Sequence, residues 1–242
     1  MKAMKKIFGV TVCSFLMVIF SFSASFGVPL LQLYGEGATY DSGSETWITT
    51  ESSFTLWVMG NVNGPGGKGS IMDVFLSVAY PTDETGTVSI TPTMTSLVTD
   101  PSTPDDPIFH STGDGTNPTM SDGADLPSHG VYGPGTSWDK YSIGNLVSTD
   151  SPVADLIDSF PTYPGPLWKY SSGQINAYSV AITGYSWVHF DAFDHIDGTT
   201  NAFFAPFSHD AEKVPEPSTL LLLGSGLTVI ALWGRRKFKV KS

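Results

Sequence analysis

Residues 53–60 read SFTLWVMG, and this stretch decides the expected fold class. Phe54, Leu56 and Val58 stand at every second position of it. Because side chains alternate between the two faces of an extended strand, these three share one face. The segment therefore predicts a β-strand that turns one face toward a hydrophobic core.

Further segments of the same kind lie on both sides of this stretch. The run at residues 71–80 is nearly all apolar, which predicts a strand in the centre of its sheet. Residues 87–91 predict a strand that Pro92 ends. The other expected elements are strands at residues 31–34, 45–50, 136–141, 174–184 and 186–192, and a short helical turn at residues 155–160. No stretch shows the 3.6-residue period of an amphipathic helix.

Two stretches lack strand patterning. Residues 61–69 are rich in glycine and predict a turn or loop. Residues 99–135 are rich in Pro, Asp, Gly and Ser and predict a long irregular insertion, although such a loop is unusual in a compact domain. Many strands joined by long loops predict an all-β fold, an antiparallel β-sandwich of jelly-roll-like type.

The N-terminus has the order of a secretory signal peptide. Lys2, Lys5 and Lys6 precede an apolar run at residues 7–20, and small residues follow it. The run is 14 residues long, shorter than the roughly 20 residues that a spanning helix needs. We therefore expect a signal helix over residues 1–27 that signal peptidase removes, with an uncleaved anchor helix as the alternative.

The C-terminus combines three features in order. Pro215, Glu216 and Pro217 form a proline-rich motif, an apolar segment covers residues 219–233, and a basic end follows. A helix of these 15 residues spans about 22 Å, less than the bilayer core of about 30 Å. The flanking residues expected to reach the membrane interface are Trp233, Arg235 and Arg236.

Together these three features resemble the PEP-CTERM sorting signal, over residues 214–242. The resemblance implies recognition by an exosortase-type membrane enzyme and cleavage near the motif. It also implies an inner-membrane intermediate, held by the C-terminal transmembrane helix. From there the protein is transferred to the cell surface or extracellular matrix of a Gram-negative-type bacterium that makes exopolysaccharide. The alternative is a plain membrane anchor.

Residues 28–213, between the two ends, form the expected extracellular domain. They hold 22 acidic residues against four lysines, a formal charge of −18. A field this negative excludes general binding to nucleic acid or anionic lipid. It suits solubility outside the cell, and it leaves Ca²⁺, which prefers oxygen ligands, as a candidate cofactor. The single cysteine, Cys13, lies in the signal segment, so the domain has no disulfide and no thiol nucleophile.

Asp191, Asp194 and Asp197 form the sharpest polar cluster, and Gly198 follows them. Several oxygens around one turn would suit Ca²⁺, although the spacing is not that of an EF-hand. The alternative is an ordinary Asp-Gly turn after a strand. On that strand His189 would share a face with Asp191, a spacing that suits a metal ion or proton transfer, and a solvated surface histidine is the simpler interpretation.

Trp168 lies in a proline-rich, loop-like context and is the best candidate for an exposed ligand contact. Exposed aromatic rings stack on sugars, so exopolysaccharide is a candidate partner. The sequence has no Gly-x-Ser-x-Gly elbow, phosphate loop or Cys/His pair, and we therefore expect no enzyme. It favours a structural or adhesive surface protein, with a carbohydrate-binding module or a secreted hydrolase as alternatives.

The layout also resembles the bacterial choice-of-anchor proteins, in which a β-rich ectodomain carries interchangeable C-terminal anchors. The segments that carry this resemblance are residues 54–56, FTL, and residues 187–191, WVHFD. The resemblance implies surface display, and it names neither a ligand nor a catalytic residue.

Overall fold

The computed structural model describes residues 28–64, 66–94, 104–127, 130–159, 171–206 and 210–215. Within these ranges the protein is all-β, with strands β1 to β13 and one helical turn, α1 (Leu156–Ser159). The expected signal helix at residues 1–27 and the expected membrane helix at residues 219–233 lie outside the described residues. No helix in the described ranges is long and apolar enough to cross a membrane.

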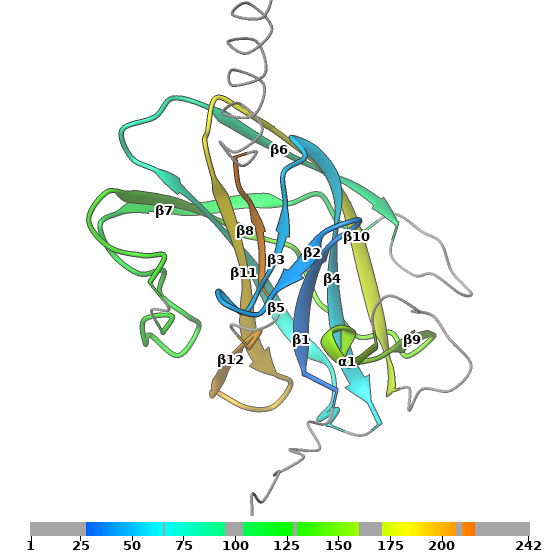
Figure 1. The fold of residues 1–242 in the computed structure, drawn as a ribbon. Helices are drawn as coiled ribbons and strands as arrows, with labels where there is room; N and C mark the ends of the chain where they lie inside the picture. The colour runs from blue at the N-terminus through cyan, green and yellow to red at the C-terminus, as the bar shows by residue number, and fades with distance from the viewer. Residues whose placement is uncertain are drawn as a thin grey trace, which may run out of the picture.

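The strands form two sheets (Figure 1). The smaller sheet has five antiparallel strands, in which the long strands β4 and β10 lie side by side. In order they are β1 (Leu31–Gly35), β4 (Ser53–Asn63), β10 (Ser171–Thr183) and β6 (Thr87–Met94), with β9 (Ser151–Val153) also paired to β10.

The larger sheet has eight strands, and β5 and β11 are its centre. In order they are β2 (Thr39–Asp41), β3 (Thr46–Thr49), β13 (Asp210–Lys213), β11 (Val188–Ile196), β5 (Ile71–Pro81), β8 (Thr136–Ser142) and β7 (Ile108–Asp114), with β12 (Ala202–Phe204) also paired to β11. The pair β3–β13 is parallel, and the other pairs in this sheet are antiparallel.

One hydrophobic core joins the two sheets. Leu56 and Val58 of β4 are fully buried in it, together with Phe190 of β11. The rings of Phe54 and Phe190 meet edge to face across the sheets, with centroids 6.0 Å apart. The face predicted from the alternation in residues 53–60 is therefore the core face of β4.

A second, smaller core covers the other face of the larger sheet, here called the outer face. Phe193 of β11 and Trp138 of β8 pack there against Leu126 and Tyr132. Leu126 and Tyr132 belong to the connection between β7 and β8, so this connection lies over the sheet rather than away from it. His189 and Asp191, on the outer face of β11, are consequently shielded from water.

The structure corrects three details of the sequence-based prediction. The strand expected to end at Pro92 continues to Met94, because β6 is the last strand of its sheet in the described residues and an edge strand tolerates a missing N–H. The expected irregular insertion at residues 99–135 contains β7. The glycine-rich loop begins later than expected, since β4 runs to Asn63.

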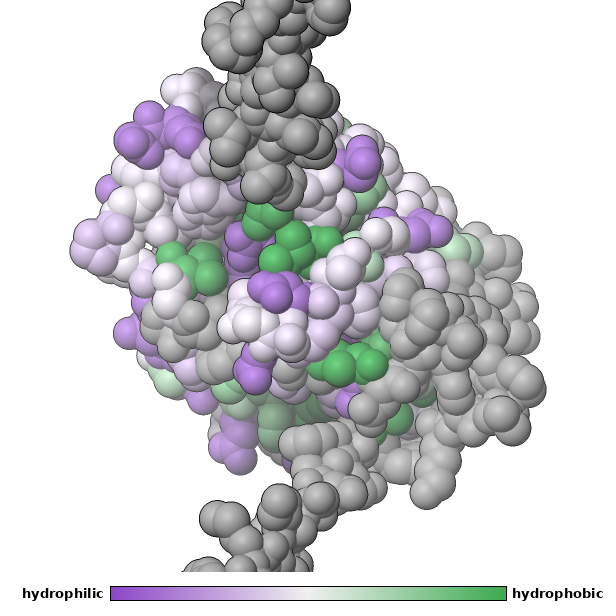
Figure 2. Space-filling view, viewed as in Figure 1, coloured by the Kyte–Doolittle hydropathy of each residue, from purple (hydrophilic) through white to green (hydrophobic). Residues whose placement is uncertain are grey.

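Two other expectations are confirmed, namely the all-β class and the central place of the strand at residues 71–80. The short turn at Leu156–Ser159 also forms where it was expected. The assignment to a jelly-roll type within the all-β class stays a prediction. On the face seen in Figure 2, apolar residues form small separate groups among hydrophilic and weakly polar ones.

Candidate functional site

Two clusters of histidine and carboxylate side chains lie along β11. The first, here called the His189 cluster, consists of His189, Asp191, Asp210, Glu212 and Tyr132. His189 and Asp191 stand two positions apart on the outer face of β11, and the register pairs His189 with Glu212 on the neighbouring strand β13. The cluster is thus built from two adjacent strands, with Tyr132 placed over it by the β7–β8 connection.

Both ring nitrogens of His189 face carboxylates. Nδ1 lies 3.1 Å from a Glu212 oxygen, while Nε2 lies 3.5 Å from Asp191 Oδ1 and 3.8 Å from Asp210 Oδ2. The Tyr132 hydroxyl donates a hydrogen bond to Asp191. His189 is 1% exposed and Asp210 is fully buried, so water screens these charges weakly.

The protonation states of the cluster follow from this burial. Desolvation would lower the pKa of His189, but the charge of Asp191 and hydrogen bonds to the surrounding carboxylates raise that pKa well above its ordinary value. Burial and the charge of Asp191 raise the pKa of Asp210 well above its usual range, against the effect of His189. This environment therefore favours the charged imidazole of His189 and the protonated form of Asp210.

We expect the free energy of unfolding to fall as the pH rises from 6.5 to 8.5. The folded pKa of His189 lies above its unfolded value, near 6.5, so the folded protein holds the extra proton in this range. Its stabilising contribution is complete below about pH 6.5 and is lost as the pH rises through the folded pKa, at about 1.4 kcal/mol per pH unit. The raised pKa of Asp210 likewise lowers the free energy of unfolding as the pH rises above about 4, because the folded protein holds this proton more tightly than the unfolded chain.

Urea denaturation at pH 6.5, 7.5 and 8.5 measures this slope, and the variant His189→Gln should flatten it. A stability that is constant or rises over this range in the unmodified protein would contradict a charged His189.

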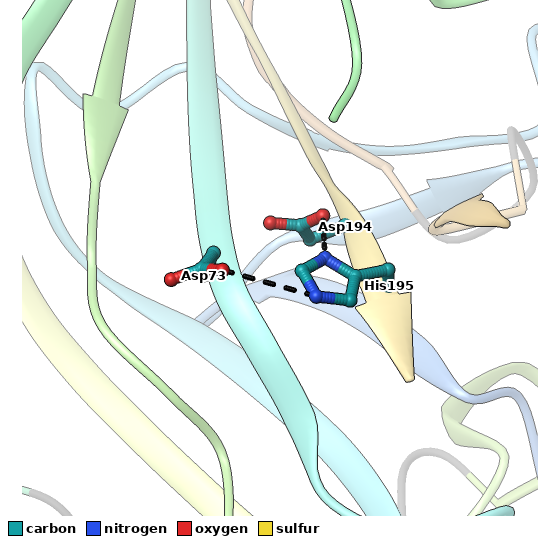
Figure 3. Close-up of side chains that lie close together, drawn as sticks. All are labelled: Asp73, Asp194 and His195. Atoms are coloured by element: carbon teal, nitrogen blue, oxygen red, sulfur yellow. Dashed lines mark hydrogen bonds and ion pairs between the residues drawn. The ribbon is translucent and has the colours of Figure 1, made fainter. Parts of the chain in front are cut away.

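The second cluster, here called the Asp73 cluster, consists of Asp73, Asp194 and His195 (Figure 3). Its three side chains come from β5 and β11, and one ligand atom from each lies within 4.8 Å of the others. His195 Nδ1 lies 2.7 Å from Asp194 Oδ1, and His195 Nε2 lies 3.8 Å from Asp73 Oδ2. Unlike the His189 cluster, this one opens to solvent, because the Asp73 side chain is 69% exposed.

A β-bulge places the Asp73 cluster. The register between β5 and β11 shifts between Phe193 and His195, and Asp73 lies opposite this shift with φ at +51°. Asp73 is one of the residue types that enter this left-handed region most readily. Its backbone N–H donates a 2.7 Å hydrogen bond to the side chain of Asn145, which fixes the bulge. Bulges of this kind redirect side chains out of the regular alternation.

Burial is the main influence on the pKa of Asp194. Burial raises the pKa of Asp194, and hydrogen bonds from Ser121 and His195 oppose that rise. The 2.7 Å contact with His195 Nδ1 is the short, well-formed bond of the cluster. Asp194 therefore orients the imidazole and leaves Nε2 directed at Asp73.

The structure does not bring the three carboxylates of the calcium hypothesis together. Asp191 belongs to the His189 cluster, Asp194 belongs to the Asp73 cluster, and Asp197 belongs to neither. The reason is that β11 runs on to Ile196, so the first two residues lie in an extended strand rather than in a turn. Three residues of strand span about 10 Å, too far for carboxylates to share one ion.

The structure also tests two smaller expectations. His189 and Asp191 do share a face, as their spacing predicted, but His189 is buried and is not the surface histidine of the simpler interpretation. The turn at Asp197 and Gly198 is present. Sequence reasoning missed Asp73, Asp210 and Glu212, because only long-range strand pairing brings them to β11.

The remaining predicted site residues lie beyond the described ranges, apart from Pro215, which is exposed at the end of the last range. Those outside the described residues are Trp168, Glu216, Pro217, Trp233, Arg235 and Arg236. Strand β13 ends at Lys213, and the Val214 N–H donates a 2.9 Å hydrogen bond to the Thr49 carbonyl. The folded domain therefore extends to the residue before the predicted sorting motif.

Residues 213–237 match a known family, the PEP-CTERM protein-sorting motif. The chain carries a PEP-CTERM sorting signal. This finding confirms the resemblance drawn from Pro215, Glu216 and Pro217 and the segment that follows them. A PEP-CTERM signal implies export through the membrane to the cell surface and processing by an exosortase-type enzyme. No curated protein and no solved structure matches the chain, so the resemblance to the choice-of-anchor proteins stays a prediction.

Proposed function

We propose that this PEP-CTERM protein is a non-enzymatic, structural or adhesive component of an exopolysaccharide-associated surface layer or extracellular matrix. The single observation that carries the proposal is the sorting signal at residues 213–237. It begins at Lys213, the last residue of β13, which is the last strand along the described part of the chain. Cleavage near Pro217 would therefore release the domain with all its described strands intact.

The chemistry of the described domain supports this role. Residues 28–213 carry a formal charge of −18, which keeps neighbouring copies apart and the domain hydrated outside a Gram-negative-type cell. Asp191 and Asp210 of the His189 cluster are buried, and Asp191 accepts a hydrogen bond from Tyr132. A hydrolytic pair of carboxylates would instead flank an open substrate cleft. The carbohydrate-binding module and the secreted hydrolase stay alternative hypotheses.

Mass spectrometry of both termini tests the sorting step. We expect the chain from cells that contain the exosortase-type enzyme to start after about residue 27 and to lack the residues beyond about Pro217. Cells without the enzyme should retain the chain through Ser242 in their membranes. The variant Glu216→Ala should behave like the enzyme deletion, while the matched variant Glu36→Ala, far from the motif in the sequence, should be processed normally.

Fractionation of the same cells tests the destination. The processed form should appear in the surface or matrix fraction together with exopolysaccharide, and removal of the polysaccharide should release it. An intact Ser242 in every strain would refute processing, and a processed form that stays in the medium without polysaccharide would refute the structural role.

A further inference from the structure

The Asp73 cluster has the layout of a metal-binding histidine with a supporting carboxylate. In Figure 3 the ring of His195 lies between two carboxylates, Asp194 at Nδ1 and Asp73 facing Nε2. The 2.7 Å contact to Asp194 fixes Nδ1 as the protonated nitrogen when the ring is neutral. The lone pair of Nε2 then points toward Asp73, and a carboxylate that holds the far nitrogen of a ligand histidine is the usual outer partner of such sites.

The gap between Nε2 and Asp73 fits a bridging ion better than a direct bond. At 3.8 Å the separation of His195 Nε2 and Asp73 Oδ2 is too long for a hydrogen bond. Two ligands at about 2.1 Å from one tetrahedral ion lie about 3.4 Å apart. A shift of a few tenths of an ångström by the exposed Asp73 side chain closes that difference.

Asp194 supplies an independent observation. Its side chain is fully buried, and its Oδ2 atom has no hydrogen-bond partner within the part of the chain that the structure describes. A buried carboxylate oxygen without a donor is costly unless positive charge lies nearby. The Lys140 ammonium already interacts with the charge of Asp194, and a cation bound through His195 would add positive charge at the ring that Asp194 contacts.

We propose that the Asp73 cluster binds one divalent transition-metal ion of the Zn²⁺ class, with His195 Nε2 and Asp73 as its protein ligands. Asp194 is the positioning residue that orients His195. Water completes the coordination shell, because the side chains of Asp73 and His195 are 69% and 21% exposed and leave an entry path. An imidazole with a carboxylate suits Zn²⁺, whereas Ca²⁺ takes six to eight oxygen ligands and gains nothing from a ring nitrogen.

This proposal is independent of the sorting reaction. It also differs from the calcium hypothesis in its residues and its ion, since the ligand Asp73 comes from a different strand and Asp191 and Asp197 take no part. The site lies at the junction of β5 and β11. A bound ion would therefore stabilise the bulge at which β5 and β11, the two central strands of the larger sheet, change register.

Calorimetric titration of the full-length chain, purified in detergent and stripped of metal, tests the proposal. We expect one Zn²⁺ per chain, and Ca²⁺ should not compete for the site. His195→Ala should weaken Zn²⁺ binding by at least about 100-fold, and Asp194→Asn by about 10- to 100-fold. Asp73→Asn should also weaken it, and this exposed position should leave the fold unchanged.

The control is His110→Ala, which removes an exposed histidine on β7 and should leave Zn²⁺ binding unchanged. A Co²⁺-loaded sample should give visible absorption bands that the His195 variant lacks, a readout that a merely structural role would not alter. Absence of Zn²⁺ uptake, uptake unaffected by both His195→Ala and Asp73→Asn, or displacement by Ca²⁺ would each overturn the proposal.

Discussion

Replacing Phe190 with alanine is expected to lower the free energy of unfolding by about 3–5 kcal/mol. Phe190 is fully buried in β11, at the centre of the larger sheet. It pairs with Val78 of β5 on one side and Ala211 of β13 on the other. Its ring meets Phe54 of the smaller sheet edge to face, so its loss opens a cavity at the junction of both sheets.

Urea denaturation at one fixed pH measures this loss, and Phe109→Ala provides a matched control. Phe109 lies on β7 and is 56% exposed, so the same substitution there should change the free energy of unfolding by no more than about 1 kcal/mol. Similar losses for the two variants would show that Phe190 does not link the sheets, and the two-layer packing around it would be wrong.

The core faces of the central strands were predictable because their pattern is local. Phe54, Leu56 and Val58 stand at alternate positions, and all three are buried as the two-residue period requires. The apolar run at residues 71–80 likewise indicated a central strand. Strand order was not predictable, since the parallel pairing of β13 with β3 joins segments from opposite ends of the domain.

The candidate sites were predictable only in part, for a related reason. His189 and Asp191 were placed on one face by their spacing, but their partners Asp210 and Glu212 come from β13. The alternation of polar residues on β11 also resembles that of a solvated face. This face of β11 is buried because the β7–β8 connection places Tyr132 over it. The connection is rich in proline and glycine, and nothing in its sequence predicts which surface of the sheet it will cover.

The bulge at Asp73 also could not be predicted from the sequence pattern. Within residues 71–80 this residue is the single charged one, and a regular strand would place it on a fixed face. The positive φ of Asp73 and the register shift between Phe193 and His195 turn its side chain out of that regular alternation. A left-handed aspartate carries no signature in the sequence, so the Asp73 cluster becomes visible only when β5 and β11 are seen together.

Removing the imidazole of His189 is expected to cost about 3–5 kcal/mol of stability at pH 7, because the variant His189→Ala leaves buried carboxylates without their cation. Asp191 lies 3.5 Å from Nε2, and Glu212 lies 3.1 Å from Nδ1. Asp191 is 3% exposed, so water cannot replace the lost partner without opening the cover over the strand. The protein should respond by taking up protons, and the variant should lose less stability at pH 5 than at pH 7.

A double-mutant cycle with Asp191→Asn separates this electrostatic cost from lost packing. If the imidazolium and Asp191 stabilise each other, the double variant should be more stable than the sum of the single losses implies, by about 1–3 kcal/mol. His110→Ala, at an exposed histidine on β7 whose ring meets Phe75 edge to face, should change stability by no more than about 1 kcal/mol. Strictly additive losses, or a loss below about 1 kcal/mol for His189→Ala, would mean that His189 is neutral in the folded protein. The carboxylates around it would then have to be balanced by their own protons, and any fall in stability between pH 6.5 and 8.5 would come from Asp210 rather than from His189.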